Sequence, residues 1–110
     1  MCGIAGIVCF KRSAADILEN KMMLKKMTNC IAHRGPDGEG QVCLDEGHVF
    51  LGHRRLAVID LSAAAAQPMQ SIDKRYTISY NGEVYNYKEL RRELEKKGYS
   101  FFSDSDTEVV

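Results

Sequence analysis

The stretch MCGIAGI (residues 1–7) opens the chain and decides the fold that we expect. Its two glycines let neighbouring backbone approach closely, and its two isoleucines are typical of a buried strand. We therefore predict a strand over residues 3–10. Removal of the initiator methionine would leave Cys2 as the first residue, with a thiol and a free α-amine on one carbon.

This arrangement favours a nucleophile at Cys2. An α-amine has an ordinary pKa near ~8, well below the ~10.4 of a lysine amine, so it is partly unprotonated at neutral pH. It can then accept the proton of the thiol, directly or through one water, as in enzymes with an N-terminal nucleophile. The alternative is that Cys2 is an ordinary small apolar residue at the end of the chain.

The composition narrows the class of protein. The 110 residues amount to one small domain, and 15 basic side chains balance 15 acidic ones. This balance argues against a nucleic-acid-binding protein and a polybasic membrane anchor, so we expect neither kind of partner. The four cysteines contain no CxxC pair and the three histidines complete no zinc spacing, so we expect no metal site. Free thiols without a signal peptide fit a cytoplasmic protein.

The region after the first strand predicts a helix and a hairpin. Ser13 and Asp16 form a helix start signal, and apolar residues at helical spacing continue the pattern until Pro36 must end it. Residues 41–44 and 48–53 then flank a turn that contains glycine, as in a β-hairpin. Three further helix residues are expected to broaden the buried face: Met22, Met23 and Cys30.

Two adjacent arginines, Arg54 and Arg55, lead into the apolar run 56–59, for which we predict a buried strand. In extended backbone, neighbouring side chains point to opposite faces, so one arginine can be solvated while the other reaches inward and needs a carboxylate. A small carboxylate ligand and an internal ion pair satisfy this need equally well.

Asn81-Gly82 follows a predicted strand over residues 75–80. Asn-Gly between two apolar runs is a strong hairpin signal. The same residues also supply a side-chain amide and a backbone N–H, the two donors that an oxyanion hole needs, with the Glu83 carboxylate beside them. The residue types leave both interpretations open.

The last part of the sequence predicts further elements and an abrupt end. Asn86 begins a predicted second helix that Gly98 closes, and a strand over residues 99–102 follows. Ser105 or Asp106 would begin a third helix, but the sequence stops soon afterwards at two valines. Since so short a helix has little stability of its own, we expect a domain that is incomplete at its C-terminus.

Six stretches, taken together and in this order, resemble the glutaminase domain of glutamine-dependent asparagine synthetases. This domain is a class II glutamine amidotransferase of the N-terminal-nucleophile hydrolase fold, an α+β four-layer αββα sandwich. The resemblance implies that residues 1–110 are the N-terminal portion of that domain, with the synthetase domain absent. The stretches are CGIAG (2–6), HRGPD (33–37), RLAVID (55–60), QPM (67–69), NGEVYN (81–86) and SDTEV (105–109).

The resemblance also implies residue roles. Cys2 would attack the side-chain amide of glutamine, Asn81 and Gly82 would hold the oxyanion, and Arg34 would belong to the loop around the site. Arg55 would bind the α-carboxylate, and two carboxylates would bind the α-ammonium group. The implied substrate-binding positions are Arg55, Leu56, Ala57, Val58, Ile59, Asn81, Gly82, Glu83 and Asp106.

The implied reaction is hydrolysis of L-glutamine to L-glutamate and ammonia through a γ-glutamyl thioester. The ammonia would pass to a C-terminal synthetase domain that makes asparagine from aspartate. No cofactor is expected in this segment: ATP and Mg²⁺ would belong to the absent synthetase domain, and the chain has no glycine-rich phosphate loop. A homodimer of the full-length enzyme is compatible with the resemblance. The alternatives are an amidotransferase for another acceptor, such as an amino sugar or a polysaccharide, and an inactive truncated module.

Overall fold

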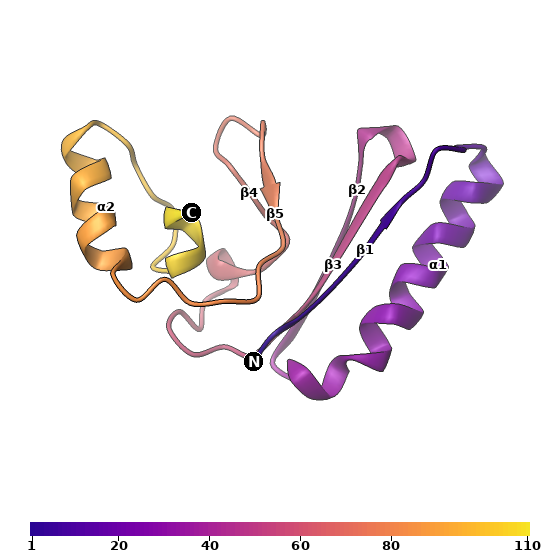
Figure 1. Cartoon of the computed structure of the whole chain (residues 1–110), viewed down its shortest axis with the longest axis horizontal. Helices are drawn as coiled ribbons and strands as arrows, with labels where there is room; N and C mark the ends of the chain where they lie inside the picture. Colours follow the sequence, from indigo (N-terminus) through magenta and orange to yellow (C-terminus); the bar gives the residue numbers. More distant parts are fainter.

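A computed structural model describes residues 1–110 and confirms the α+β class. The helices are α1 (Ala14–Cys30) and α2 (Tyr87–Lys96). The strands are β1 (Gly3–Val8), β2 (Gly38–Leu44), β3 (Val49–Arg55), β4 (Met69–Gln70) and β5 (Thr77–Ile78). Along the longest axis of the molecule, α1 is followed by the sheet of β1, β2 and β3, then by β4 and β5, and finally by α2 (Figure 1).

β3 is the central strand of a three-stranded antiparallel sheet with the order β1-β3-β2. The register places Gly3 opposite Arg54. The turn between β2 and β3 uses left-handed backbone, with φ of 49° at Asp45 and 99° at Gly47, where glycine adopts such angles without strain. The predicted first strand and the predicted hairpin are therefore confirmed.

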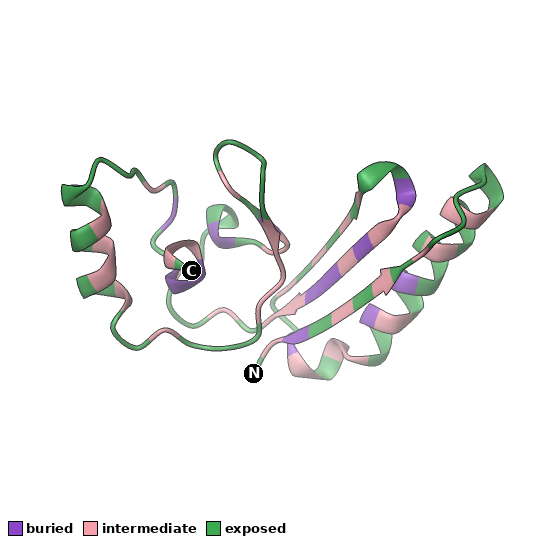
Figure 2. Ribbon diagram, turned by 45° about the horizontal axis from the view of Figure 1, so that its top comes forward, coloured by how far each residue is buried: buried purple, intermediate pink, exposed green.

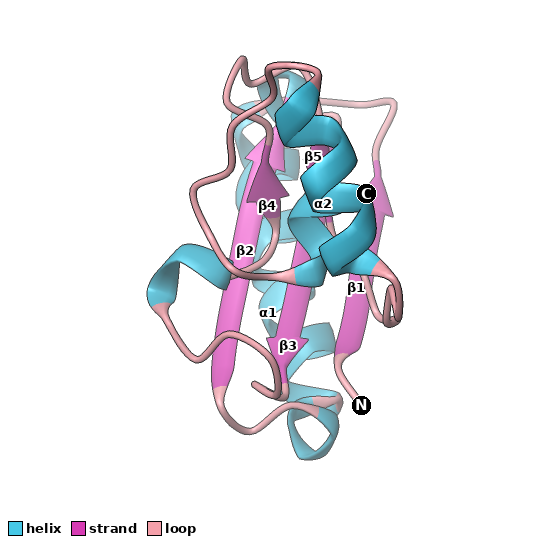
Figure 3. Ribbon diagram, turned by 90° about the vertical axis from the view of Figure 1, so that its left-hand side faces the viewer, coloured by secondary structure: helices cyan, strands magenta, loops and turns pink.

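α1 covers one face of this sheet (Figure 3). Its predicted start is confirmed, because Ser13 and Asp16 form a capping box: the Asp16 N–H donates to Ser13 Oγ at 3.1 Å, and the Ser13 N–H donates to Asp16 Oδ2 at 3.0 Å. The buried side chains of Leu24 and Thr28 lie directly over Gly52 of β3, where a Cβ atom would collide with Thr28. Close approach of helix and strand thus depends on this glycine.

The contact face of α1 is narrower than the sequence suggested. Leu24 and Thr28 are its only fully buried residues. The prediction that three more side chains join the core is wrong, because they lie outside the face that meets the sheet. Exposed in this way are Met22, Met23 and Cys30.

The second half of the chain packs against the other face of the sheet. Gly40 of β2 lies so close to the segment before β4 that a Cβ atom there would overlap the carbonyl oxygen of Gln67. β4 and β5 pair antiparallel over two residues each. Buried residues are few and cluster where layers touch, as Figure 2 shows for β3 and the turns near the C-terminus.

Residues 56–59 do not form the predicted buried strand. β3 ends just before them, and their first N–H groups donate to side chains instead of to a neighbouring strand. The Leu56 N–H donates to the sulfur of Cys2 at 3.3 Å, and the Ala57 N–H donates to Asp37 Oδ2 at 2.9 Å. These side-chain acceptors replace a sheet partner and turn the apolar run into a loop.

Two other strand predictions are wrong in whole or in part. Of residues 75–80, only Thr77 and Ile78 form a strand, β5, which pairs with β4. Residues 99–102 form no strand. Here the carboxylate of Glu108 accepts the N–H groups of Phe102 and Ser103, each at 2.7 Å, so these donors are not available to a sheet.

The predicted second helix forms with the expected boundaries, whereas the predicted third helix does not form as an α-helix. α2 begins directly after Asn86, but the Asn86 side chain makes no capping hydrogen bond, and Gly98 follows the helix with φ of 93°. The predicted third helix is a 3-10 turn over Asp106–Val109, with Ser105 as its cap. Neither α-helix is long and apolar enough to cross a membrane.

A Gly40→Ala substitution should destabilise the chain by about 1–3 kcal/mol, because the new methyl group must push the Gln67 backbone away from the sheet. Gly6→Ala is the matched control: Gly6 lies on the same face in β1, and its Cβ would meet other atoms only at 3.4 Å or more. Urea unfolding of both variants measures the difference. Equal stability of the two variants would contradict the close contact.

Candidate active site

Cys2 is held in place by backbone and side-chain contacts at the start of β1. Its sulfur accepts the Leu56 N–H at 3.3 Å, and its carbonyl oxygen accepts a hydrogen bond from Arg34 Nε at 3.2 Å. Arg34 belongs to the 3-10 turn after α1, and Leu56 follows β3. The candidate nucleophile is therefore fixed between two segments that are distant from it in sequence.

The half-buried thiol opens onto a cavity of about 500 Å³ with 16 lining residues. All but one of the residues expected at the site belong to this lining. Ala57 does not, and its N–H donates to Asp37 instead. The predicted residues that line the cavity are Cys2, Arg55, Leu56, Val58, Ile59, Asn81, Gly82, Glu83 and Asp106.

The two arginines that end β3 have different partners. Arg54 forms an ion pair with Glu39 at 3.0 Å and a hydrogen bond with Asn29 Oδ1 at 2.7 Å, on the α1 side of the sheet. Arg55 donates through Nη1 to the carbonyl oxygen of Ser62 at 2.8 Å and has no carboxylate within ion-pair distance. The internal ion pair thus belongs to Arg54, while Arg55 keeps N–H donors for a ligand in the cavity.

Carboxylates lie in the lining as well. Asp106 is 7% exposed, and its Oδ2 accepts the Val84 N–H at 2.8 Å, which leaves the other oxygen available. Glu83 is exposed and makes no ion pair. Asp60 also lines the cavity, and hydrogen bonds from the side chain and backbone of Ser62 lower the pKa of its carboxyl group. The cavity thus offers one guanidinium and three carboxylates.

Asn81 and Gly82 do not form the hairpin that their sequence allows. They lie in the irregular segment between β5 and α2. The preceding residue, Tyr80, has its N–H bound to Gln67 Oε1 at 2.6 Å and its carbonyl oxygen bound to His53 Nε2 at 3.1 Å. The Tyr80 ring packs against Gly82 so closely that a Cβ atom there would collide with its hydroxyl group. Asn81 and Gly82 both belong to the lining of the cavity.

His53 is fully buried beneath this segment, at 0% exposure. Burial lowers its pKa, and the charge of Arg55 acts in the same direction, while the hydrogen bond to Tyr80 opposes them. The ring is therefore neutral at pH 7. Because a carbonyl oxygen only accepts hydrogen bonds, Nε2 must carry the proton, and Nδ1 is buried with no partner.

Several lining residues were not predicted from the sequence. Gln67 connects two segments, since its amide donates to Thr107 Oγ1 at 3.2 Å and accepts from Tyr80. In the sequence it belongs to the QPM motif (67–69), to which no role was assigned. The other unpredicted lining residues are Met1, Asp60, Tyr80, Tyr85, Ser105 and Thr107.

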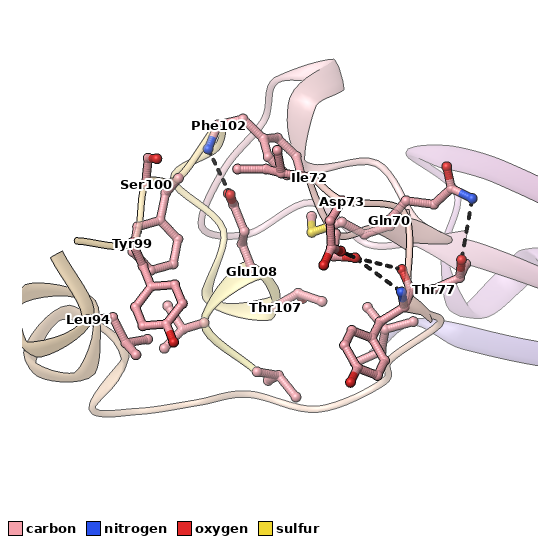
Figure 4. A pocket seen from close by; sticks show the side chains of 17 residues that line it. Gln70, Ile72, Asp73, Thr77, Leu94, Tyr99, Ser100, Phe102, Thr107 and Glu108 are labelled. Carbon is pink, nitrogen blue, oxygen red and sulfur yellow. Dashed lines mark hydrogen bonds between the residues drawn. The ribbon is translucent and has the colours of Figure 1, made fainter. Parts of the chain in front are cut away.

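A larger hollow of about 780 Å³ lies between the β4–β5 hairpin and the C-terminal part of the chain (Figure 4). Its lining is mostly apolar, and no cysteine, histidine, lysine or arginine belongs to it. Its Glu108 carboxylate is occupied by the N–H groups of Phe102 and Ser103.

No group of three or more His, Cys, Asp or Glu side chains in the chain is arranged to hold a metal ion. The chemistry-bearing residues converge on the smaller cavity.

The residue types that line this smaller cavity match the needs of a zwitterionic ligand and of acyl transfer. An α-amino acid head group needs a cation and an anion, which Arg55 and Asp106 provide. Acyl transfer needs a nucleophile, a base and donors for an oxyanion. The candidate nucleophile Cys2 and the candidate donor residues Asn81 and Gly82 line the same cavity.

Known proteins agree with this chemistry. A family model described as a glutamine amidotransferase domain matches residues 1–110. Asparagine synthetase [glutamine-hydrolyzing] 1 of Bacillus subtilis is 46% identical over 110 residues, which are 100% of this chain and 17% of that protein. Asparagine synthetase B of Escherichia coli is 34% identical over the whole of this chain, which covers 19% of that protein. Asparagine synthetase 1 of Arabidopsis thaliana is 38% identical over the whole of this chain, which covers 18% of that protein.

This chain thus spans less than a fifth of the length of these curated relatives. The family model, in contrast, is matched along the entire sequence, including every residue that lines the cavity around Cys2. The chain therefore belongs to the glutamine amidotransferase domain family.

Proposed function

We propose that this chain hydrolyses L-glutamine to L-glutamate and ammonia, with Cys2 as the nucleophile. One observation carries the proposal: a single cavity is lined by Cys2, Arg55, Asn81 and Asp106, residues that come from four separate parts of the sequence. A thiol, a guanidinium, an amide and a carboxylate are the groups that glutamine hydrolysis requires. Membership of the amidotransferase family supports glutamine as the substrate.

The reaction would begin after Met1 is removed. The free amine of Cys2 takes the thiol proton, and the thiolate attacks the side-chain amide carbon of glutamine. The carbonyl bond opens to an oxyanion that the Asn81 amide and the Gly82 N–H stabilise. The C–N bond then breaks, and nitrogen leaves as ammonia with the proton that the amine carried. Water hydrolyses the γ-glutamyl thioester, which releases L-glutamate and restores the thiol.

Substrate recognition would use the charges of the cavity. The free N–H donors of Arg55 bind the α-carboxylate of glutamine in a bidentate way. The carboxylates of Asp106 and Glu83 bind the α-ammonium group on the opposite wall. Apolar side chains cover the methylene groups of the substrate, and those in the lining are Leu56, Val58 and Ile59.

We further propose that the chain works as part of a longer enzyme. The relatives are asparagine synthetases, so the ammonia would serve ATP-dependent synthesis of asparagine from aspartate in a C-terminal synthetase domain, which would also take Mg²⁺. Within the α+β class, the fold of the complete domain would be the four-layer αββα sandwich of N-terminal-nucleophile hydrolases. The order of α1, the three-stranded sheet, β4–β5 and α2 along the molecule supports it (Figure 1).

An electrophilic analogue of glutamine should label Cys2 alone. Iodoacetamide, which needs no binding site, should instead react with the exposed thiols of Cys30 and Cys43. Peptide mass spectrometry distinguishes the two patterns, and excess L-glutamine should suppress only the first. Cys2→Ala should abolish glutamate formation without changing the unfolding midpoint. Labelling of another cysteine by the glutamine analogue would contradict the assignment.

Removal of Met1 should be required for turnover, because a peptide bond at Cys2 leaves no basic amine to take the thiol proton. Met1 is 76% exposed, so an aminopeptidase can reach it. Protein samples with and without Met1, distinguished by intact mass, should differ in glutamate release by about a hundredfold or more. Equal release from both samples would rule out the amine as the base.

Arg55→Gln should raise KM for glutamine at least about tenfold, since it removes the cation that binds the α-carboxylate. Arg54→Gln is the matched control: it makes the same chemical change one residue away, where the guanidinium serves the ion pair with Glu39. It should lower stability and leave KM unchanged. Steady-state rates and urea unfolding measure both quantities. An equal rise of KM in the two variants would remove Arg55 from the substrate site.

A further inference from the structure

The segment that carries Asn81 and Gly82 is not fixed by any ladder of backbone hydrogen bonds. Residues 79–83 lie outside all helices and strands and make no backbone–backbone hydrogen bond. Side chains hold this segment instead. Two of them bind the two polar backbone groups of Tyr80, the residue directly before Asn81. The position of the cavity wall at this point therefore depends on these side chains.

We infer that His53 and Gln67 are positioning residues for the oxyanion donors. His53 Nε2–H binds the Tyr80 carbonyl oxygen at 3.1 Å, and Gln67 Oε1 accepts the Tyr80 N–H at 2.6 Å. Together they fix the backbone just before the peptide plane that orients the Asn81–Gly82 donors. The catalytic importance of this positioning rests on the function proposed above, whereas the positioning itself does not.

Both side chains belong to well-anchored parts of the molecule. His53 lies on β3, the central strand, which is hydrogen-bonded on both sides. The amide of Gln67 is also fixed by its hydrogen bond to Thr107 at 3.2 Å. Functional groups keep their geometry best when the residues that support them are themselves locked by packing and hydrogen bonds.

The hydrogen bonding of His53 itself argues for this role. Its Nδ1 is the only buried side-chain nitrogen or oxygen without a partner in the chain. A buried imidazole carries a desolvation cost that an apolar side chain would not, so its presence here calls for an explanation. The gain that offsets the cost is the Nε2–H bond to Tyr80.

The test compares His53→Leu, which removes the donor, with His53→Gln, whose side-chain amide can replace Nε2–H. His48→Leu is the control: His48 also bonds a backbone carbonyl, that of Cys9 at 2.7 Å, but at the far end of β3. In His53→Leu we expect kcat for glutamine hydrolysis to fall about ten- to a hundredfold, less than when an oxyanion donor is lost outright. KM should change little, because Arg55 and Asp106 remain. His53→Gln should recover most of the rate.

Amide NMR spectra supply a readout that is independent of turnover. His53→Leu should shift the backbone resonance of Gly82 and the side-chain amide resonance of Asn81, and His48→Leu should not. If the wild-type protein hydrolyses no glutamine, the proposed function is wrong. The shifts of the Gly82 and Asn81 resonances would still show whether His53 positions these two residues. Unchanged resonances, or a rate loss shared equally by His48→Leu, would overturn the positioning role.

One measurement covers the case in which His53→Leu does not fold. The ¹⁵N spectrum of the wild-type imidazole reports which ring nitrogen carries the proton. We expect a neutral His53 with hydrogen on Nε2 and none on Nδ1. A ring protonated on Nδ1 alone could not donate to Tyr80, and this result would also overturn the inference.

Discussion

The register of β1 on β3 is the constraint on which the rest of the site depends. With Gly3 opposite Arg54, the residue before β1 meets the residues that follow Arg54, so the thiol of Cys2 reaches the Leu56 N–H. A slip of one residue would exchange the two faces of the strand. Because β3 stays paired with β2, Cys2 would then lie on the α1 face of the sheet, away from Arg55 and the cavity. Pairing along six residues of β1 makes such a slip costly.

The two walls of the cavity are built in different ways. The wall that bears Cys2 and Arg55 belongs to, or directly adjoins, a hydrogen-bonded sheet. The wall that bears Asn81 and Asp106 has no sheet partner, and side chains fix it. Val84 N–H binds Asp106, and Gln67 bridges Tyr80 and Thr107. This wall therefore depends on individual side-chain hydrogen bonds and not on a sheet ladder.

Sequence patterns predicted local structure wherever the backbone satisfies its own hydrogen bonds. The helix that begins with the capping box of Ser13 and Asp16, and the hairpin around residues 45–47, form as expected. Two of the strand predictions failed where carboxylates take the backbone donors. Asp37 binds the Ala57 N–H, and Glu108 binds the N–H groups of residues 102 and 103, so two apolar runs with strand-like composition become loops.

The sequence by itself determined the candidate groups for catalysis: a cysteine at position 2, an Asn-Gly pair and the motifs that match glutamine amidotransferases. Only the tertiary structure decided which arginine faces the cavity, since Arg54 and Arg55 are chemically identical and differ only in the side of β3 on which they lie. It also revealed Gln67 in the lining of the cavity and His53 buried behind it. Their role depends on contacts across 27 and 13 residues of sequence, and no local pattern encodes such contacts.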